Sequence, residues 1–184
     1  EPGFDLGEVD RLFALLREAL VPFVQEVLES PNQPDKAILY EFYNIQRQET
    51  LGRHVIQMMG FDMSRGRLDV TAHPMFLGNS PWDVRLSTRY KERHFIDATF
   101  NTIHEAGHGL FQQGVDPQYF GMPIGWLRSM GLHESQSRIW EVWVGRSSAL
   151  WQYLWPVMCT LFPDATNGRT FRDLFCAVNK VERS

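Results

Sequence analysis

Residues 93–114, RHFIDATFNTIHEAGHGLFQQG, decide the fold of this chain. Apolar and small residues recur in this stretch at the spacing of one helical face: Ile96, Phe100, Ile103, Gly107 and Leu110. A polar stripe is offset from that face and consists of Asp97, Asn101, His104 and His108. Gly114 is expected to end the helix. The pattern predicts a helix that packs on one side and lines a cavity or site on the other.

The polar stripe contains the pattern H-E-x-x-H at His104, Glu105 and His108. Two imidazoles four residues apart lie on one helix face, where both can reach the same tetrahedral zinc ion. Glu105 lies beside them and can hold a zinc-bound water, whose pKa the metal lowers toward about 7. It can take a proton as this water attacks a carbonyl and later return it to the leaving amine. A solvated helix could carry the same letters by chance, but Phe100 and Phe111 argue against a fully solvated helix.

Glu134 is the strongest candidate for a third ligand, because a catalytic zinc usually has three protein ligands and one open position. It follows His108 by 26 residues, across a loop and on the next predicted helix. Spacing leaves four rivals open: His133, Asp116, His94 and Glu141. An ordinary helical ion pair with Arg138 would also account for Glu134. In many zincins an acidic residue four positions after the glutamate ligand hydrogen-bonds a zinc histidine. Arg138 occupies that position here, so we expect another residue to hold the histidine. The candidates are Asp97, Asn101 and Glu141.

The rest of the chain predicts further helices and one small sheet. Apolar residues fall at helical spacing over residues 6–28, with a kink or restart at Pro22, and again over residues 39–58. A last helix is expected over residues 171–181. A long helix is expected from Leu127 to Tyr153, with a buried middle at residues 139–150 and a stop at Pro156. Residues 68–73 and 83–88 alternate as strands do, and residues 74–81 are predicted to form turns. We therefore expect a mainly α fold with a small antiparallel β-sheet.

The composition is that of an ordinary globular protein and suits one domain or a piece of a larger one. Apolar residues make up 43% of the 184, and six are Trp. The net charge is -4 without a cluster of Lys or Arg, so nothing recommends a nucleic-acid partner. The most apolar stretch, residues 149–162, is too short to span a bilayer. Cys159 and Cys176 show no CxxC pattern and are typical of reduced thiols in an intracellular protein.

Three stretches, in this order, resemble successive signatures of the M32 carboxypeptidase family. They are Asp83-Val84-Arg85-Leu86-Ser87, His104-Glu105-Ala106-Gly107-His108 and His133-Glu134-Ser135-Gln136. The resemblance covers most of the chain and is strongest from Leu51 to Trp140. It implies a zincin-like, largely helical fold with the small sheet beside the active site and a deep groove. The first signature departs from the family pattern D-x-R-x-T, since it ends in Ser87 with Thr88 directly after it.

The resemblance also implies an activity, namely the removal of C-terminal residues from peptides. His104, His108 and Glu134 would be the zinc ligands and Glu105 the general base, with Co2+ as a substitute for zinc. The expected partners are peptides with a free C-terminus, and neither a nucleic acid nor a membrane. Many M32 enzymes are cytoplasmic homodimers, and we expect the same here. Four more residues are candidates for contacting the substrate or supporting the ligands: Asp83, Arg85, His133 and Gln136.

Chains of this family are considerably longer and continue past residues 181–182 into the signatures I-[IV]-R-x-x-A-D and G-x-x-Q-D-x-H-W. The Arg of the first is the expected anchor for the terminal carboxylate of the substrate. We therefore expect residues 1–184 to be a single catalytic-core segment of a larger metallocarboxypeptidase, with N- and C-terminal parts missing. Arg85 is then the obvious cation for a carboxylate, unless it pairs with Asp83. Two alternatives stay open: a truncated, inactive zinc-binding domain, or an HExxH peptidase of another specificity.

Overall fold

The structure is a computed structural model and describes residues 3, 5–126 and 129–182. Its α-helices are α1 (Leu6–Glu29), α2 (Ile45–Met58), α3 (Phe95–Gln113), α4 (Met130–Arg138), α5 (Ser148–Leu161), α6 (Pro163–Thr166) and α7 (Phe171–Val178). A π-helical segment, η5 (Ile139–Val144), follows α4 directly. The strands are β1 (Gly66–Val70), β2 (Met75–Ser80) and β3 (Asp83–Thr88). The prediction of a mainly α fold with one small sheet is confirmed.

The sheet is mixed, so the predicted antiparallel arrangement was wrong. The strand order is β1-β3-β2, with β1 parallel and β2 antiparallel to β3. The segment predicted to form turns is in large part β2, because Pro74 and Gly78 concealed the strand pattern. Gly78 has a packing reason instead: a Cβ there would lie 2.8 Å from Gln112 of α3 and 2.4 Å from Phe76. Strand β2 is therefore pressed closely against α3.

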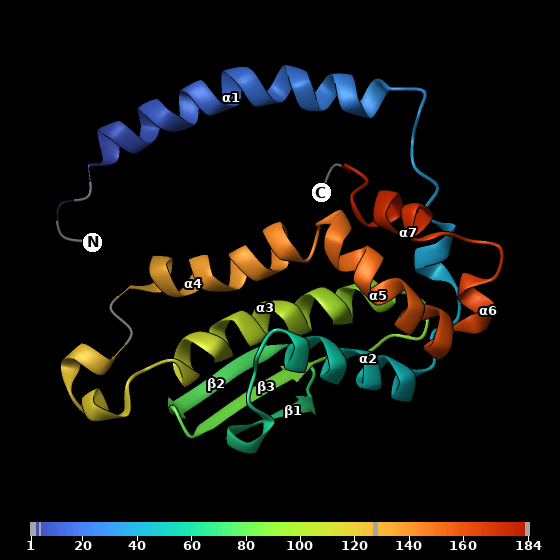
Figure 1. The fold of residues 1–184 in the computed structure, drawn as a ribbon. Helices are drawn as coiled ribbons and strands as arrows, with labels where there is room; N and C mark the ends of the chain where they lie inside the picture. The colour runs from blue at the N-terminus through green and yellow to red at the C-terminus, as the bar shows by residue number, and fades with distance from the viewer. Residues whose placement is uncertain (1–2, 4, 127–128, 183–184) are drawn as a thin grey trace.

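Helix α3 lies between the sheet on one side and α4 with η5 on the other (Figure 1). Val84 and Leu86 of β3 are buried beneath it, and a Cβ on Gly109 would lie 3.0 Å from Leu86. The buried core continues through α2, α5 and α7. Its largest fully buried side chains include Tyr43, Leu51, Ile56, Phe95, Ile103, Trp151, Leu154, Met158 and Leu174. Burial on this scale fixes α3 as the central element of the fold.

The long helix predicted over residues 127–153 is broken into three parts. Its expected start at Leu127 lies outside the described residues, and α4 begins after Ser129, whose hydroxyl accepts from the Leu132 amide. Gly145 and Arg146 then separate η5 from α5, and Ser147 caps the new helix. The stop at Pro156 was wrong, because α5 continues to Leu161. Apolar residues on both sides of the proline, Leu154 and Met158, are fully buried and hold the helix to the core.

The middle of that stretch, residues 139–150, is buried only in part, because Leu150 is buried but no residue of η5 is. Trp143 is 78% exposed, and Ile139 and Val142 are exposed as well. Their side chains lie on a face of η5 that no other described residue covers. The prediction failed because an apolar sequence does not specify which of its faces will be packed against a neighbour.

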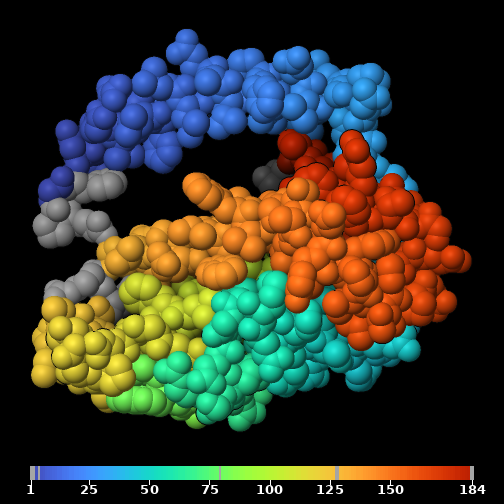
Figure 2. Space-filling view, viewed as in Figure 1, coloured from blue at the N-terminus to red at the C-terminus, as the bar shows by residue number. Residues whose placement is uncertain are grey.

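Helix α1 stands apart from the rest of the described molecule. Figure 2 shows open space between it and α4 along much of its length. It runs without a break through Pro22, so the predicted restart is not observed, and none of its residues is buried. Its exposed apolar residues include Leu12, Phe13, Leu16, Leu20 and Phe23. Among the described residues, no helix combines the length and hydropathy that crossing a bilayer would require.

Helices α3 and α4 approach each other closely at Gly107. A Cβ at this position would lie 2.6 Å from the Cα of Ser137 and 2.9 Å from the carbonyl oxygen of Gln136. Both are backbone atoms, so a larger residue could be accommodated only by moving α4. The absence of a side chain at Gly107 thus sets the distance between the two helices.

We predict that Gly107→Ala lowers the free energy of unfolding by about 1–3 kcal/mol, the usual cost of overpacking. The matched control is Gly52→Ala in α2, where the nearest atoms to a new Cβ lie 3.6 Å away. Because alanine favours helix, this variant should be stabilised by up to about 1 kcal/mol. Urea unfolding followed by circular dichroism measures both. Equal effects of the two substitutions would contradict the assigned role of Gly107.

Candidate metal centre

The two histidines of the H-E-x-x-H pattern lie one turn apart on α3, as predicted. Their ring centroids are 4.9 Å apart, and both rings face α4. His108 is buried at 7% exposure, and the side chain of His104 is 18% exposed. This preorganises two nitrogen donors on a rigid, well-packed helix.

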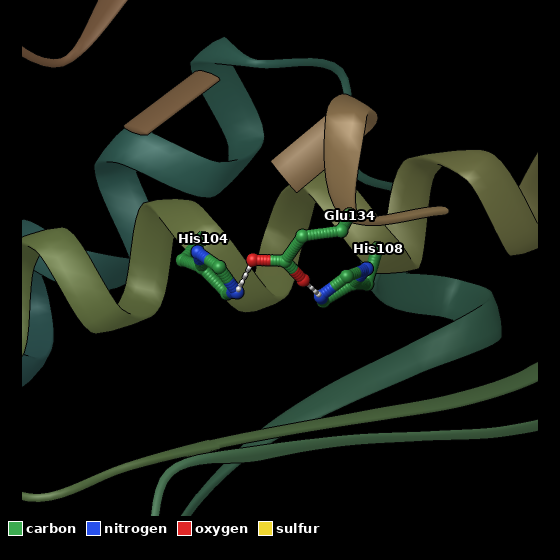
Figure 3. A group of neighbouring side chains, drawn as sticks. All are labelled: His104, His108 and Glu134. Atoms are coloured by element: carbon green, nitrogen blue, oxygen red, sulfur yellow. Dashed lines mark ion pairs between the residues drawn. The ribbon is translucent and has the colours of Figure 1, made fainter. Parts of the chain in front are cut away.

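Glu134 enters the same space from α4 (Figure 3). Its Oε1 lies 3.6 Å from His104 Nε2, and its Oε2 lies 3.4 Å from His108 Nε2. A donor atom from each of the three residues lies within 4.8 Å of the other two. Of the candidates left open by spacing, Glu134 is therefore the one that the fold brings to the histidine pair.

The distances suit a shared metal ion better than direct hydrogen bonds. A charge-assisted N–H···O bond is about 2.7–2.9 Å long, which is shorter than either contact. Zinc ligands about 2.0–2.2 Å from a tetrahedral ion are separated from one another by about 3.3–3.6 Å. The carboxylate–imidazole separations of 3.6 and 3.4 Å, one from each oxygen of Glu134, are close to that spacing. Two imidazoles and one carboxylate are also a donor set typical of a catalytic zinc site. The residues therefore fit a bound divalent metal.

The other nitrogen of His104 is held by Glu141 of η5. The distance from His104 Nδ1 to Glu141 Oε2 is 2.7 Å. Metal-bound histidines usually have such a partner, which fixes the ring and the tautomer. Glu141 was both a rival ligand and a candidate for this support, and the structure places it in the supporting position. Its separation of seven residues from Glu134, about two helical turns, is the signal that puts both on one face.

The remaining rival ligands are engaged elsewhere. Asp116 accepts from the Gln118 amide in a tight turn. His94 and Lys91 both pair with Asp97, which is therefore not the support of a zinc histidine.

His133 packs against His108 rather than reaching the donor group. It is 6% exposed, and the two ring centroids are 4.1 Å apart. Phe76 of β2 and Phe111 of α3 enclose it, each with its ring centroid at 5.3 Å. Burial lowers the pKa of His133, and burial followed by the nearby His133 and His104 lowers the pKa of His108 to about 4. His108 is thus neutral near pH 7, the state that can bind a metal.

Glu105 lies in a cavity of about 390 Å³ next to His104. The cavity is lined by Ala72, His73, Pro74, Arg89, Asn101, His104, Glu105, Arg138 and Glu141. Burial raises the pKa of the Glu105 carboxyl, and the charges of Glu134 and Glu141 act in the same direction while His104 opposes them. A carboxylate with a raised pKa beside two histidines is typical of an acid–base site.

Asp83 and Arg85 are not part of this cavity. They form a two-pronged ion pair at 2.9 and 3.0 Å on the exposed face of β3, opposite Val84 and Leu86, which are buried beneath α3. The alternative that Arg85 pairs with Asp83 is what the structure shows.

Gln136 is half-buried and donates weakly to Ser135, 3.4 Å away, without lining the cavity. The cations that do line it, Arg89 and Arg138, were missed as cavity residues by the sequence reasoning. The signal for Arg138 was its position four residues after Glu134.

The comparisons with known proteins agree with this geometry. Residues 1–184 match the family described as carboxypeptidase Taq (M32) metallopeptidase. The chain is 40% identical to thermostable carboxypeptidase 1 of Thermus thermophilus and 35% identical to carboxypeptidase 1 of Bacillus subtilis, over its whole length in both cases. It spans 36% and 37% of these relatives. The crystal structure of an M32 carboxypeptidase from Deinococcus radiodurans superposes with a TM-score of 0.94 at 41% identity, covering 100% of this chain and 37% of that one. The chain belongs to the M32 metallopeptidase family.

Proposed function

We propose that this chain is the metal-binding and proton-transferring core of a zinc-dependent carboxypeptidase. The observation that carries the proposal is the meeting of His104, His108 and Glu134 beside a cavity that also contains Glu105. The names of the relatives, all carboxypeptidases, support removal of C-terminal residues as the reaction. Because the chain spans little more than a third of those relatives, activity and substrate remain part of the proposal.

His104, His108 and Glu134 would hold the ion, and Glu141 would keep the His104 ring in its binding orientation. A zinc ion bound there supplies a Lewis acid that polarises a carbonyl and makes water more acidic. Co2+ is proposed as a substitute.

Glu105 would accept a proton from water in the cavity and pass it to the nitrogen of the departing amino acid. Its raised pKa favours both steps. A group transfers protons best in both directions when its pKa lies near the working pH, and the ordinary pKa of a carboxyl lies well below pH 7. The charged groups beside it include Arg89 and Arg138, which make the cavity suitable for a substrate carboxylate.

We predict that Glu105→Gln retains about one zinc per chain and lowers hydrolysis by about 10²–10⁴-fold, because only the proton acceptor is lost. The assay is cleavage of an N-blocked dipeptide with a free carboxylate, and zinc is measured by atomic absorption. The control is Glu26→Gln, which changes an exposed glutamate of α1.

The alternatives give different results in the same assay. Cleavage by Glu105→Gln at the original rate would refute the assignment of the base. Zinc binding without turnover by the unaltered chain would identify a metal-binding domain that is not catalytic. Equal cleavage of a C-terminally amidated peptide would indicate a peptidase of another specificity.

The low pKa of His108 predicts how the metal-free chain responds to acid. Folding lowers this pKa from its ordinary value of 6.5 to about 4, so between these values the unfolded chain binds more protons than the folded one. The free energy of unfolding should therefore fall as pH decreases from about 6.5 to 4, by up to about 3 kcal/mol from this group.

Urea unfolding at several pH values tests the expectation. His108→Asn should remove most of the pH dependence in this window, whereas His73→Asn, at an exposed position, should not. The same slope in all three proteins would show that His108 does not titrate in this way.

A further inference from the structure

Arg138 connects the two carboxylates that surround the histidine pair. Its Nε lies 3.1 Å from Glu134 Oε1, and its Nη1 lies 3.2 Å from Glu141 Oε2. The same Glu141 oxygen is 2.7 Å from His104 Nδ1. His104, Glu141, Arg138 and Glu134 thus form a closed ring of contacts, since Glu134 Oε1 is also 3.6 Å from His104 Nε2.

We propose that Arg138 is a positioning residue that makes Glu134 a one-oxygen metal ligand and holds Glu141 against His104. The inference rests on the proposed metal function and extends it to a residue outside the ligand set.

The two oxygens of Glu134 have different surroundings. Arg138 donates to Oε1, whereas Oε2 lies 3.4 Å from His108 and accepts no hydrogen bond from the described residues. The N–H of the guanidinium occupies a lone pair of Oε1, so Oε2 is the oxygen that keeps its lone pairs available to a metal. A carboxylate with both oxygens free can bind a metal through both and fill the position that a catalytic site keeps open.

The planar guanidinium is necessary because two carboxylates must be held at once. Glu134 comes from α4 and Glu141 from η5, and their charges repel each other. The fork of Arg138 places one N–H on each, which a single ammonium group on a flexible stem cannot do with the same geometry. Glu141 is largely shielded, with a side chain 19% exposed, so its contact is screened less by solvent than an ordinary surface pair.

A second ion pair of the chain resembles that of Arg138 and Glu134 but includes no proposed metal ligand, so it serves as a control. Arg53 and Glu49 of α2 have the same four-residue spacing, a 2.9 Å contact and side chains 42% and 40% exposed. The corresponding values for Arg138 and Glu134 are 3.1 Å, 57% and 42%. Loss of either pair should change stability little, as exposed ion pairs contribute little. Only Arg138 should affect metal binding.

The test compares Arg138→Gln, Arg138→Lys and Arg53→Gln with the unaltered 184-residue chain. Zinc affinity is measured by competition with a chromophoric chelator, and the coordination number is read from visible absorption of the Co2+-loaded proteins. We expect Arg138→Gln to bind zinc about 10–100-fold more weakly, the usual effect of losing a group that supports a ligand. Its Co2+ absorption should weaken, because five-coordinate Co2+ absorbs less than tetrahedral Co2+. Arg53→Gln should match the unaltered chain in both measurements.

The outcomes separate this inference from the proposed function. Failure of the unaltered chain to bind zinc would overturn both. Zinc binding by the unaltered chain, with the same affinity and Co2+ spectrum in Arg138→Gln, would overturn the role of Arg138 alone. Circular dichroism verifies the fold of each variant, and Arg138→Lys gives the comparison if the glutamine variant does not fold. Its charge is kept but its fork is lost, so a spectrum identical to that of the unaltered chain would also overturn the proposal.

Discussion

The close approach of two helices at Gly107 is the constraint on which the site depends. Both histidines belong to α3, and the third donor belongs to α4, so the spacing of the helices decides whether the three can share an ion. The backbone of Ser137 and Gln136 fills the place where a side chain at Gly107 would lie. Glu134 lies three residues before Ser137 in α4, and at this helix spacing its side chain reaches both imidazoles. Ligand geometry follows here from backbone packing, which is stiffer than the side chains themselves.

The site gathers acidic groups, and the fold must neutralise them. Glu105, Glu134 and Glu141 all lie around His104. Burial raises the pKa of Glu105, and the charges of Glu134 and Glu141 act in the same direction while His104 opposes them. Arg138 offsets part of this charge, and a divalent ion would offset more. The three carboxylates thus have different surroundings and different roles. Glu134 faces both imidazoles, Glu141 contacts Nδ1 of His104, and Glu105 lines the cavity. Such separation of like groups by environment is typical of acid–base sites.

The local part of this arrangement was predictable and the nonlocal part was not. Two histidines at i and i+4 need only a helix to meet, and α3 has the length and the stripes that its sequence indicates. The position of Glu134 relative to the histidines depends on the path of the loop between α3 and α4, which the sequence does not specify. Spacing therefore left several candidate ligands, and the family resemblance selected Glu134 among them. The parallel pairing of β1 and β3 depends on β2, which resembles a turn in sequence because it contains Gly78 and directly follows Pro74. The exposure of Trp143 could not be predicted, because it depends on which face of η5 the rest of the structure covers.

A metal at this position would also have a structural role, because its ligands would connect α4 to α3. Helix α4 is only nine residues long, and its buried residues are His133 and Ser137, so few apolar contacts anchor it among the described residues. A short helix of this kind is marginal by itself and relies on its tertiary contacts. An ion that binds only the folded chain adds about 2.7 kcal/mol of stability at a hundredfold excess over its dissociation constant. Much of that energy would act on α4, since one of the three ligands lies there. The metal would therefore stabilise the same helix that positions Glu134, and site formation and metal binding would be cooperative.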